Sequence, residues 1–476
     1  MERRKFIHQS LMATGGVLAA KSGLGRNIPS NIDFPVVRIP EAQRRFKSPA
    51  VERLINEVKS SIGNKELAWI FENCFPNTLD TTVEYYTVGG KPETYVITGD
   101  IDAMWLRDSS AQVWPYIPLC KTDKELAKMI EGLISKQAKC ILLDPYANAF
   151  YKDEKQVSEW ASDLTDMKPG VHERKWEIDS LCYPIRLAHG YWKETGSTTI
   201  FTSEWDKAME LVIQTFKEQQ RILDDGPYHF QRKAATSTDT LPMSGYGNPT
   251  NPNGLICSMF RPSDDATIFP YLIPSNIFAI ISLQNLAEIW DARGKQPELA
   301  RSARELVRTL WQAVQAYGTT FHPKYGKIYA FEANGYGSFN LMDDGNIPSL
   351  LSLPYLAHTV NTNDITYQNT RKYILSADNP YFYKGNAAEG IGSPHTGKDK
   401  IWHLGIIMRA MTSTDRTEIA QCLKMIQATH AGTGFMHESF DKDLPMNFTR
   451  KWFAWANTLC GELIWKVYRE NKTLLD

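Results

Sequence analysis

The sequence predicts an all-α protein, an (α/α)6 toroid in which six helical hairpins close into a barrel, with short β-hairpins in the loops. Helical periodicity dominates the chain from Val51 onward. In addition, six polar segments each lead straight into an apolar, aromatic-rich helix, and a second, more amphipathic helix usually follows. Stacked hairpins bury their apolar faces on one another, and closing six of them in a circle gathers the polar segments at one mouth. A two-domain helical protein is the alternative.

The individual helices are predicted where apolar residues recur at the i, i+3, i+4, i+7 spacing of one helix face. The pattern starts at 51–58 and returns at 126–134. Further helices are predicted at 176–194, 202–223, 274–293, 297–317, 346–358, 402–412, 415–430 and 451–470. Strand signals are few, short and flanked by turn residues, which predicts hairpins within loops. They lie at 83–86, 94–98 and 327–331.

The six polar segments open the predicted inner helices. They lie at 102–108, 173–179, 261–265, 343–348, 393–403 and 437–452. Their starts are roughly 45–90 residues apart, which is loose for a strict repeat but compatible with helix pairs that carry loop insertions. The helices that follow directly are apolar nearly all round, as an inner ring requires. By contrast, 298–317 and 416–430 are amphipathic, as expected for an outer ring.

The N-terminus predicts export. Arg3 and Arg4 precede a short, mildly apolar stretch that ends in small residues near Ala20, which is the order of an export signal. The arginine pair also resembles a twin-arginine signal, which favours a periplasmic location. An ordinary basic N-terminus of a cytosolic protein is the alternative. The predicted organisation is an export signal at 1–22, an extended lead-in at 23–48 and a single catalytic domain at 49–476.

The composition excludes several classes of function. A formal net charge of -1 gives no basic field for nucleic acid. No apolar run approaches the ~20 residues of a membrane span. The seven cysteines are dispersed without a CxxC pair, which predicts reduced, buried thiols. Aromatic residues make up 11% of the chain, and large aromatic side chains both fill cores and stack on sugar rings.

If the six segments meet, their side chains form a cleft rich in carboxylates and indoles. The carboxylates are Asp102, Asp108, Glu177, Asp179, Asp264, Asp265, Asp343, Asp344 and Glu438. The other polar and aromatic groups are Arg107, Arg261, His395, His403, His437, Trp105, Trp176, Trp402, Trp452 and Trp455. Such a set suits glycoside hydrolysis, in which one carboxylic acid protonates the leaving oxygen and a second carboxylate activates water or attacks the sugar.

Each of these motifs also has a structural interpretation. Arg107 and Asp108 could form an ion pair at a helix start or clamp sugar hydroxyls. Asp264 and Asp265 could cap the helix that follows, since acidic residues favour helix N-termini. As paired acids in a cleft they would instead repel each other and raise one pKa, which a general acid requires. Glu438 follows a glycine-rich turn that would hold it in a loop.

A metal site is the weaker interpretation. Asp100 and Asp102 form a DxD pattern like that of metal-dependent glycosyltransferases, but the pattern is frequent by chance. His395 and His403 lack close ligand spacing, and no HExxH motif occurs. The GxSxG, GxGxxG and GxxxxGK[ST] patterns are absent as well, which weighs against a hydrolase elbow, a dinucleotide fold and a P-loop.

Six motifs together resemble one enzyme family. They are GDIDAMWLRDS at 99–109, WEIDSLCYP at 176–184, FRPSDDA at 260–266, IPSN at 273–276, GSPH at 392–395 and MHESF at 436–440. From about residue 45 to the C-terminus the chain resembles glycoside hydrolase family 125. The resemblance implies an (α/α)6 barrel and an exo-acting α-mannosidase, chiefly on α-1,6 linkages. It further implies inversion of configuration, with no metal ion and no cofactor.

The resemblance also implies roles for individual residues. The general acid is Asp264 or Asp265, with Asp265 preferred although the register within the pair stays open, and the general base is Glu438. The predicted substrate-binding residues are Trp105, Arg107, Asp108, Trp176, Arg261, His395, Trp402, His437 and Trp455. The expected partner is a mannose-containing oligosaccharide or N-glycan fragment. The stretch 232–258, rich in Gly, Pro, Ser and Asn, is the candidate loop that closes the pocket for exo action.

Two alternatives to the α-mannosidase remain. One is another six-hairpin exo-glycosidase, such as a glucoamylase-like enzyme. The other is a non-catalytic glycan-binding protein on the same scaffold, against which the carboxylates at 264, 265 and 438 argue because a pure binder needs no acid–base set.

Overall fold

The computed structural model describes residues 34–357 and 359–476. Residues 37–476 form one compact unit. The predicted export signal at 1–22 and the part of the predicted lead-in at 23–33 lie outside the described residues. The rest of the lead-in contains a short 3-10 turn, η1 (Glu41–Gln43).

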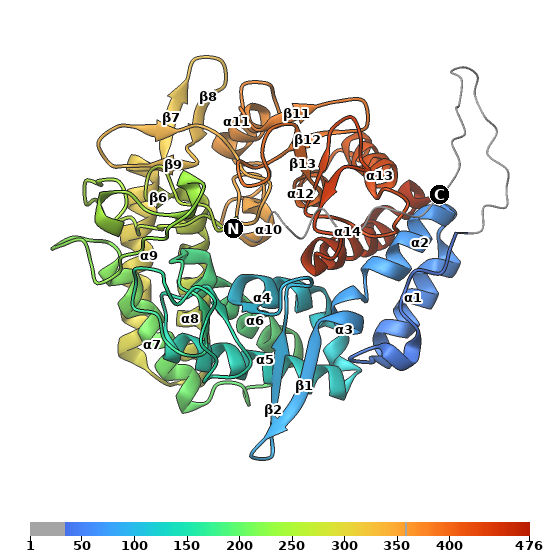
Figure 1. The fold of residues 1–476 in the computed structure, drawn as a ribbon, viewed down its shortest axis with the longest axis horizontal. Helices are drawn as coiled ribbons and strands as arrows, with labels where there is room; N and C mark the ends of the chain where they lie inside the picture. The colour runs from blue at the N-terminus through green and yellow to red at the C-terminus, as the bar shows by residue number, and fades with distance from the viewer. Residues whose placement is uncertain (1–33, 358) are drawn as a thin grey trace. The chain divides into compact units, whose positions relative to one another are not determined.

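Within the unit 37–476, a ring of inner helices runs around a common centre (Figure 1). These helices are α4 (Leu106–Val113), α6 (Ile178–Thr195), α8 (Ile273–Arg293), α10 (Leu353–Leu356), α12 (His403–Met411) and α14 (Ala454–Asn471). Helix α14 packs against α4, α4 against α6, α6 against α8, and α8 against α10, while α12 packs against α14. The last helix thereby returns to the first, as the predicted toroid requires.

The outer helices alternate with these along the chain. They are α2 (Lys65–Cys74), α5 (Lys124–Leu143), α7 (Ser203–Glu218), α9 (Pro297–Tyr317), α11 (Ile365–Ile374) and α13 (Arg416–Thr429), while α1 (Pro49–Ser61) packs on α2 and α3 (Asn77–Thr81) is a short turn of helix. Helix α9 buries one stripe, which includes Ala303, Leu306 and Leu310, whereas α8 is buried nearly all round. The predicted division into apolar inner and amphipathic outer helices is confirmed for this pair.

One predicted helix is wrong. Among the described residues of 346–358, only Leu353–Leu356 is helical. The buried Asp343 carboxylate accepts the backbone N–H groups of Leu350 (2.8 Å) and Leu351 (3.0 Å), which winds the preceding segment around it as a loop. Side-chain acceptors that bind backbone donors in this way compete with helix formation.

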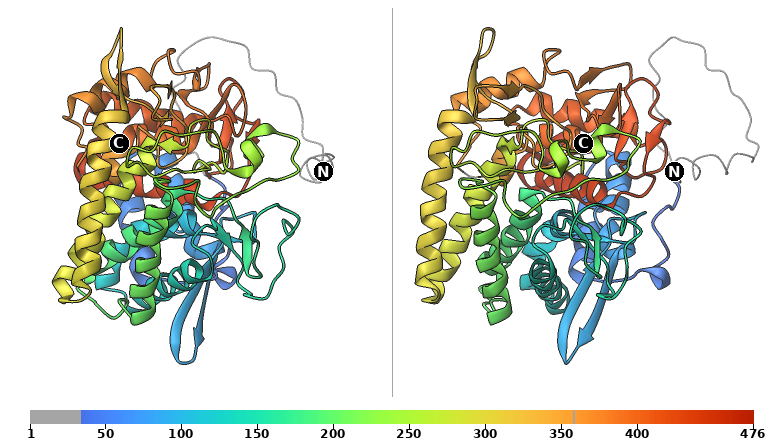
Figure 2. Two further views of the ribbon diagram at one scale, coloured as in Figure 1. Left: turned by 90° about the vertical axis from the view of Figure 1, so that its left-hand side faces the viewer. Right: turned by 60° about the vertical axis from the view of Figure 1, so that its left-hand side comes forward.

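Strands of three very short sheets lie directly before the inner helices α4, α8 and α12. Their strands are β3 (Met104–Trp105), β4 (Ala149–Phe150) and β5 (Val171–Glu173); β6 (Tyr271–Leu272), β9 (Glu332–Ala333) and β10 (Phe339–Asn340); β13 (Lys400–Trp402), β14 (Ser439–Asp441) and β15 (Phe448–Thr449). The sheet β3–β4–β5 links the first opening to the second, and the sheet β13–β14–β15 links the fifth opening to the sixth. The two views in Figure 2 show the long loops on one side of the helices.

The remaining strands form hairpins. They are β1 (Val83–Val88) with β2 (Lys91–Val96), β7 (Thr319–His322) with β8 (Gly326–Tyr329), and β11 (Phe382–Lys384) with β12 (Glu389–Ile391). Of these, β1–β2 and β8 were predicted from the sequence, and β11–β12 was not. All seven cysteines are buried and free, which confirms the prediction of reduced thiols. Among the described residues, the helices are too short or too polar to serve as membrane spans.

The first and last openings are joined by a close backbone approach. Gly99 has a φ of 134° and forms a β-bridge with Phe453. A Cβ atom at this position would lie 2.3 Å from the carbonyl oxygen of Trp452, so glycine is required both for the contact and for the positive φ. The segment before α4 therefore lies beside the segment before α14, and this brings residues about 350 positions apart into one site.

Candidate active site

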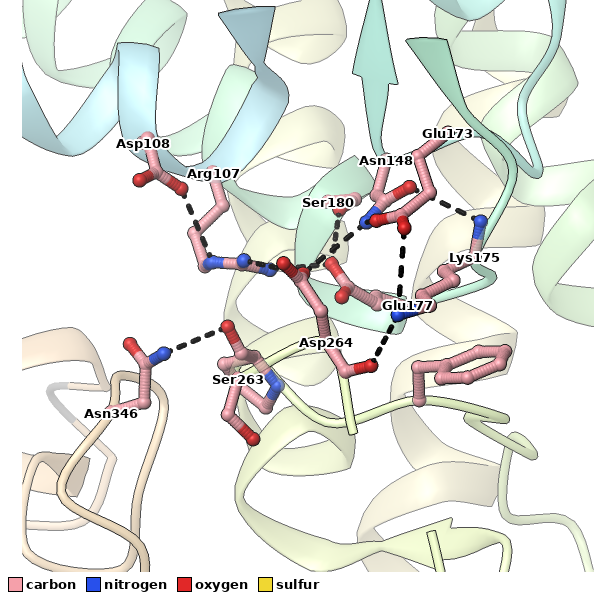
Figure 3. A network of polar contacts seen from close by, with 12 residues as sticks. Arg107, Asp108, Asn148, Glu173, Lys175, Glu177, Ser180, Ser263, Asp264 and Asn346 are labelled. Atoms are coloured by element: carbon pink, nitrogen blue, oxygen red, sulfur yellow. Dashed lines mark hydrogen bonds and ion pairs between the residues drawn. The ribbon is translucent and has the colours of Figure 1, made fainter. Parts of the chain in front are cut away.

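The first three openings meet at the guanidinium of Arg107, in the first turn of α4. Its side chain is 4% exposed. The Nη1 atom contacts Glu177 and lies 3.4 Å from Asp179 Oδ2, while Nη2 donates to Asp264 Oδ1 at 3.0 Å. The Nε atom lies 3.4 Å from Asp108 Oδ2. Figure 3 shows Arg107 directed at Asp264 and Glu177, with Asp108 on its other side.

The helix termini help to hold these charges. Asp108 lies in the first turn of α4 and Asp179 in the first turn of α6, with Glu177 at the N-cap position of α6. Negative charge is favoured there because the helix dipole and the free N–H groups point toward it. A polar segment that runs directly into an inner helix therefore delivers carboxylates to the mouth of the ring.

One guanidinium does not keep four buried carboxylates ionised. Burial raises the pKa of Asp108 and of Asp179 to about 6, despite the opposing effect of Arg107. Burial, together with the charges of Asp264 and Asp179, raises the pKa of Glu177 well above its usual range. Asp264 behaves in the opposite way: burial acts to raise its pKa, but Arg107, Lys175 and a hydrogen bond with Glu177 hold it far below normal. Asp264 is therefore held in the ionised form, whereas burial favours the protonated form of Glu177.

Asp264 and Asp265 lie in a tight turn, not at a helix start. Helix α8 begins at Ile273, so the sequence-based alternative that the pair caps this helix is wrong. Asp264 has a φ of 65°, and its N–H donates to the Arg261 carbonyl at 2.8 Å. The Arg261 N–H in turn donates to the Asp265 carbonyl at 2.7 Å. The turn points the two adjacent carboxylates to different partners.

Asp265 faces the fifth opening. Its Oδ1 atom lies 3.1 Å from His395 Nδ1, and its Oδ2 atom is buried without a hydrogen-bond partner in the described residues. Burial lowers the pKa of His395, but the hydrogen bond with Asp265 and the charges of Asp265, Glu438 and Asp264 raise it to about 9. All three predicted catalytic carboxylates therefore lie near one imidazole.

Arg261 and Asp344 stand behind the Asp265 carboxylate. Arg261 is buried and donates from Nε to Glu332 Oε1 at 2.7 Å. The pKa of Asp344 is raised to about 6 by burial and by Asp265, against the effect of Arg261. Ser393 donates to Asp344 at 3.0 Å, which links the fourth and fifth openings.

Glu438 comes from the sixth opening, directly before β14. Its side chain is 9% exposed, and Oε1 lies 3.6 Å from Arg450 Nη1. Arg450 also donates from Nε to Asp100 Oδ1 at 2.9 Å. The two aspartates of the DxD pattern therefore differ in environment: Asp100 forms an ion pair with Arg450, and the side chain of Asp102 is exposed. Within residues 34–357 and 359–476, no group of three or more His, Cys, Asp or Glu side chains could hold a metal ion.

The predicted histidines at 403 and 437 are packed into the wall. His403 is fully buried, its Nε2 lies 3.2 Å from Thr429 Oγ1, and burial lowers its pKa to about 3. His437 stacks on Phe448 with ring centroids 3.6 Å apart, and burial lowers its pKa to about 4. Both rings are neutral at pH 7, and they hold the segment that carries Glu438.

The predicted indoles differ in how they are held. Trp176 donates to the Cys257 carbonyl at 2.7 Å, and Trp402 donates to Thr396 at 2.8 Å. Trp455 packs edge-on against Tyr183 and is also buried. These three side chains support the wall by packing, with Trp402 lying 6.3 Å from the ring of His395.

The indole N–H of Trp105 is buried without a hydrogen-bond partner among the described residues. Seven buried polar atoms of this cluster lack a hydrogen-bond partner in the part of the chain that the structure describes. They are Trp105 Nε1, Arg107 Nε, Asp108 Oδ2, Glu177 Oε1, Asp179 Oδ1, Arg261 Nη2 and Asp265 Oδ2. Buried polar groups are nearly always hydrogen-bonded, so donors and acceptors concentrated in one place indicate a binding site for a ligand with many hydroxyl groups.

Several residues of this cluster were missed by sequence reasoning. Asn148 donates to Asp264 Oδ1 at 3.3 Å, and Lys175 donates to the Asp264 carbonyl at 2.8 Å. Arg450 pairs with Glu438, as described above. Lys175 and Arg450 lie inside the predicted openings, so their position was a usable signal, whereas Asn148 follows no motif.

Comparison with known proteins identifies the family. A family model described as metal-independent α-mannosidase (GH125) matches residues 64–465. The chain belongs to family GH125. It shares 41% identity over 461 residues with the meiotically up-regulated gene 157 protein of Schizosaccharomyces pombe, which covers 93% of this chain and 90% of that protein.

A solved structure gives a second close relative. It is a metal-independent α-mannosidase of Streptococcus pneumoniae in a non-productive complex with α-1,6-mannobiose. The TM-score is 0.86 at 39% identity, with 90% of this chain and 100% of that chain covered. The family resemblance and the fold class predicted from the sequence are confirmed. This GH125 protein is an α-mannosidase, a glycoside hydrolase, and the glucoamylase-like alternative is set aside.

Proposed function

We propose that this GH125 enzyme removes terminal non-reducing α-mannose, chiefly α-1,6-linked, with inversion of configuration. The unsatisfied polar atoms around Arg107 and Asp265 carry this proposal, because a single hexose supplies several hydroxyl groups that can donate and accept in their midst. The α-1,6-mannobiose bound by the pneumococcal relative supports the linkage. A mannose-containing oligosaccharide or N-glycan fragment is the substrate class.

Asp265 is the general acid in this mechanism. Its Oδ1 is held by His395, and its Oδ2 remains available for the glycosidic oxygen. Asp264 is unsuited to the role, since Arg107 and Asn148 bind its Oδ1 and its pKa is held far below the range in which it would keep a proton. Because its pKa is raised to about 9, His395 carries a proton at neutral pH, and it passes this proton to Asp265 Oδ1 as Asp265 Oδ2 protonates the leaving oxygen.

Glu438 is the general base. The Arg450 guanidinium 3.6 Å away orients its carboxylate, and the packed rings of His403 and His437 fix the preceding backbone. As the C–O bond breaks, Asp265 Oδ2 protonates the departing oxygen. Glu438 takes a proton from the water that attacks the anomeric carbon from the opposite face, so the α-mannoside is released as β-mannose.

Turnover of α-1,6-mannobiose followed by proton NMR tests the proposal. The first signal expected is that of β-mannose, which then mutarotates to the equilibrium mixture. Initial release of α-mannose would overturn inversion, and faster cleavage of α-1,3-mannobiose would overturn the linkage preference. An aryl α-glucoside is the matched control substrate, and it should stay uncleaved.

We further propose that the chain is exported in folded form. The basic N-terminus with its arginine pair supports this, as do seven buried cysteines that need no oxidation. Replacing Arg3 and Arg4 by lysine should leave the protein in the cytoplasm of a bacterial host, as should loss of the host's twin-arginine translocase. Unchanged recovery from the periplasm in both cases would refute the proposal.

A further inference from the structure

The turn that carries the proposed acid contains a strained residue. Asp264 adopts a φ of 65°, in the left-handed region that costs a non-glycine residue about 1 kcal/mol or more. Asp265 follows directly, so rotation of the Asp264 backbone would redirect the Asp265 carboxylate. Surrounding contacts must therefore hold the turn in this conformation.

Lys175 makes one such contact from beneath the turn. It lies between β5 and α6 and is buried, with 4% exposure. Its Nζ donates to the Asp264 carbonyl at 2.8 Å and to Asp239 Oδ1 at 2.7 Å, and it lies 5.2 Å from the centre of the Phe260 ring. Figure 3 shows its ammonium group between Glu173 and the Asp264 carbonyl.

The second contact comes from the stretch 232–258. Asp239 ends the 3-10 turn Ser237–Asp239, and the neighbouring Thr238 carbonyl accepts the Ala266 N–H at 2.7 Å. Arg232 donates to Asp239 Oδ1 at 3.2 Å and so anchors this segment. The Ser237–Asp239 segment therefore holds the chain on both sides of Asp265. It holds Asp264 through Lys175, and it holds Ala266 through the Thr238 carbonyl.

We propose that Lys175 is a positioning residue for the general acid. Its ammonium group, shared by the Asp264 carbonyl and the Asp239 carboxylate, fixes the turn 261–265 against the Ser237–Asp239 segment and so directs Asp265 Oδ2 into the site. Lys175 acts through the backbone of Asp264 and not on the reacting atoms. The inference rests on the proposed function, because it takes Asp265 as the acid.

Leaving-group dependence separates this role from a purely structural one. The sugar alcohol released from α-1,6-mannobiose needs protonation as it departs, whereas the acidic phenol released from 2,4-dinitrophenyl α-mannoside does not. A variant with a misplaced acid therefore loses kcat on the disaccharide and keeps it on the aryl substrate. General acid catalysis contributes about 10²–10⁴-fold, and small misplacements of a catalytic group cost up to about 10²-fold.

The test compares Lys175→Met with Lys136→Met. Lys136 is also a buried lysine, 3.5 Å from Glu93 and 3.4 Å from Glu154, but it lies on α5 outside the site. Lys175→Met should lower kcat on the disaccharide by about 10-fold to 100-fold while changing kcat on the aryl mannoside less than about 3-fold. Lys136→Met should keep the wild-type ratio of the two rates. Equal loss on both substrates with Lys175→Met would overturn the proposal.

Two further variants complete the test. Asp239→Ala removes the other end of the contact and should show the same selective loss, so it also serves if Lys175→Met does not fold. Unchanged turnover of the disaccharide in Asp239→Ala would overturn the role given to the Ser237–Asp239 segment. Asp265→Asn should show the largest selective loss, about 10³-fold on the disaccharide. If Asp265→Asn instead lost both rates equally, the assignment of the acid would fail, independently of the result for Lys175.

Discussion

Replacing Arg107 by methionine should make the stability of the enzyme strongly dependent on pH. Arg107 is the guanidinium shared by Asp108, Glu177, Asp179 and Asp264. Breaking a buried ion pair by removing one partner costs about 3–5 kcal/mol, since the other charge stays buried and unpaired. Without the guanidinium, burial raises the pKa of all four carboxylates, and the pKa values of Asp108 and Asp179 rise from about 6.

The sign of the pH effect follows from proton binding. In the variant, folded Asp108 and Asp179 therefore bind protons between pH 6 and pH 8, where the unfolded chain has released them. A native state that binds more protons than the unfolded state loses stability as the pH rises, by about 1.4 kcal/mol per pH unit for each extra proton. From pH 6 to pH 8 the free energy of unfolding should therefore fall by about 3 kcal/mol more in Arg107→Met than in the wild type.

Urea unfolding at pH 6, 7 and 8 and at constant ionic strength measures this difference. Arg107→Lys is the matched control, because it keeps one positive charge but loses the planar fork that contacts several carboxylates at once. It should be less stable than the wild type at every pH while keeping the wild-type pH dependence. Parallel curves for Arg107→Met and the wild type would refute the view that the guanidinium lowers the pKa of these buried carboxylates.

Three other predictions concern the base, the metal and two buried imidazoles. Glu438→Ala should abolish hydrolysis of α-1,6-mannobiose while calorimetry still detects mannose binding; a near wild-type rate would remove Glu438 from the mechanism. Dialysis against EDTA should leave activity unchanged, and a loss restored by calcium or zinc would contradict metal independence. In the wild type, His403 and His437 bind protons in the unfolded chain at pH 4–6 but not in the folded one, because their folded pKa values are lowered to about 3 and about 4. Each therefore lowers the free energy of unfolding by about 1.4 kcal/mol per pH unit as the pH falls, and His403→Gln should remove one such contribution in urea unfolding; an unchanged slope would contradict it.

The polar openings were predictable because the chain has to place charged residues at the N-terminal ends of buried helices. A segment such as 173–179 is polar, then abruptly apolar, and that change marks both the helix start and the site. The helix predicted at 346–358 was wrong, because the apolar spacing after Asp343 is also compatible with a loop wound around the Asp343 carboxylate. Periodicity records only where apolar residues fall, and it does not show that a buried side chain takes the backbone donors.

The indoles illustrate a second limit of prediction from the sequence. Trp105 and Trp176 both lie at openings, yet one has an unpartnered N–H and the other donates to the Cys257 carbonyl. An aromatic residue at a helix start looks the same in sequence whether it packs or binds. The partners of Lys175 were equally hidden, because they lie 64 and 89 positions away and one of them is a backbone carbonyl.

The ring explains why such a charged site can persist in the middle of a protein. The Arg107 cluster combines raised pKa values, unsatisfied polar atoms and a strained residue at 264, and each of these lowers the stability of the fold. The inner helices offset that cost, since α8 alone buries apolar side chains on nearly every face. Short sheets tie the first opening to the second and the fifth opening to the sixth, so several elements hold the cluster at once. In the proposed function, these unsatisfied groups stay in place until a sugar supplies their hydrogen-bond partners.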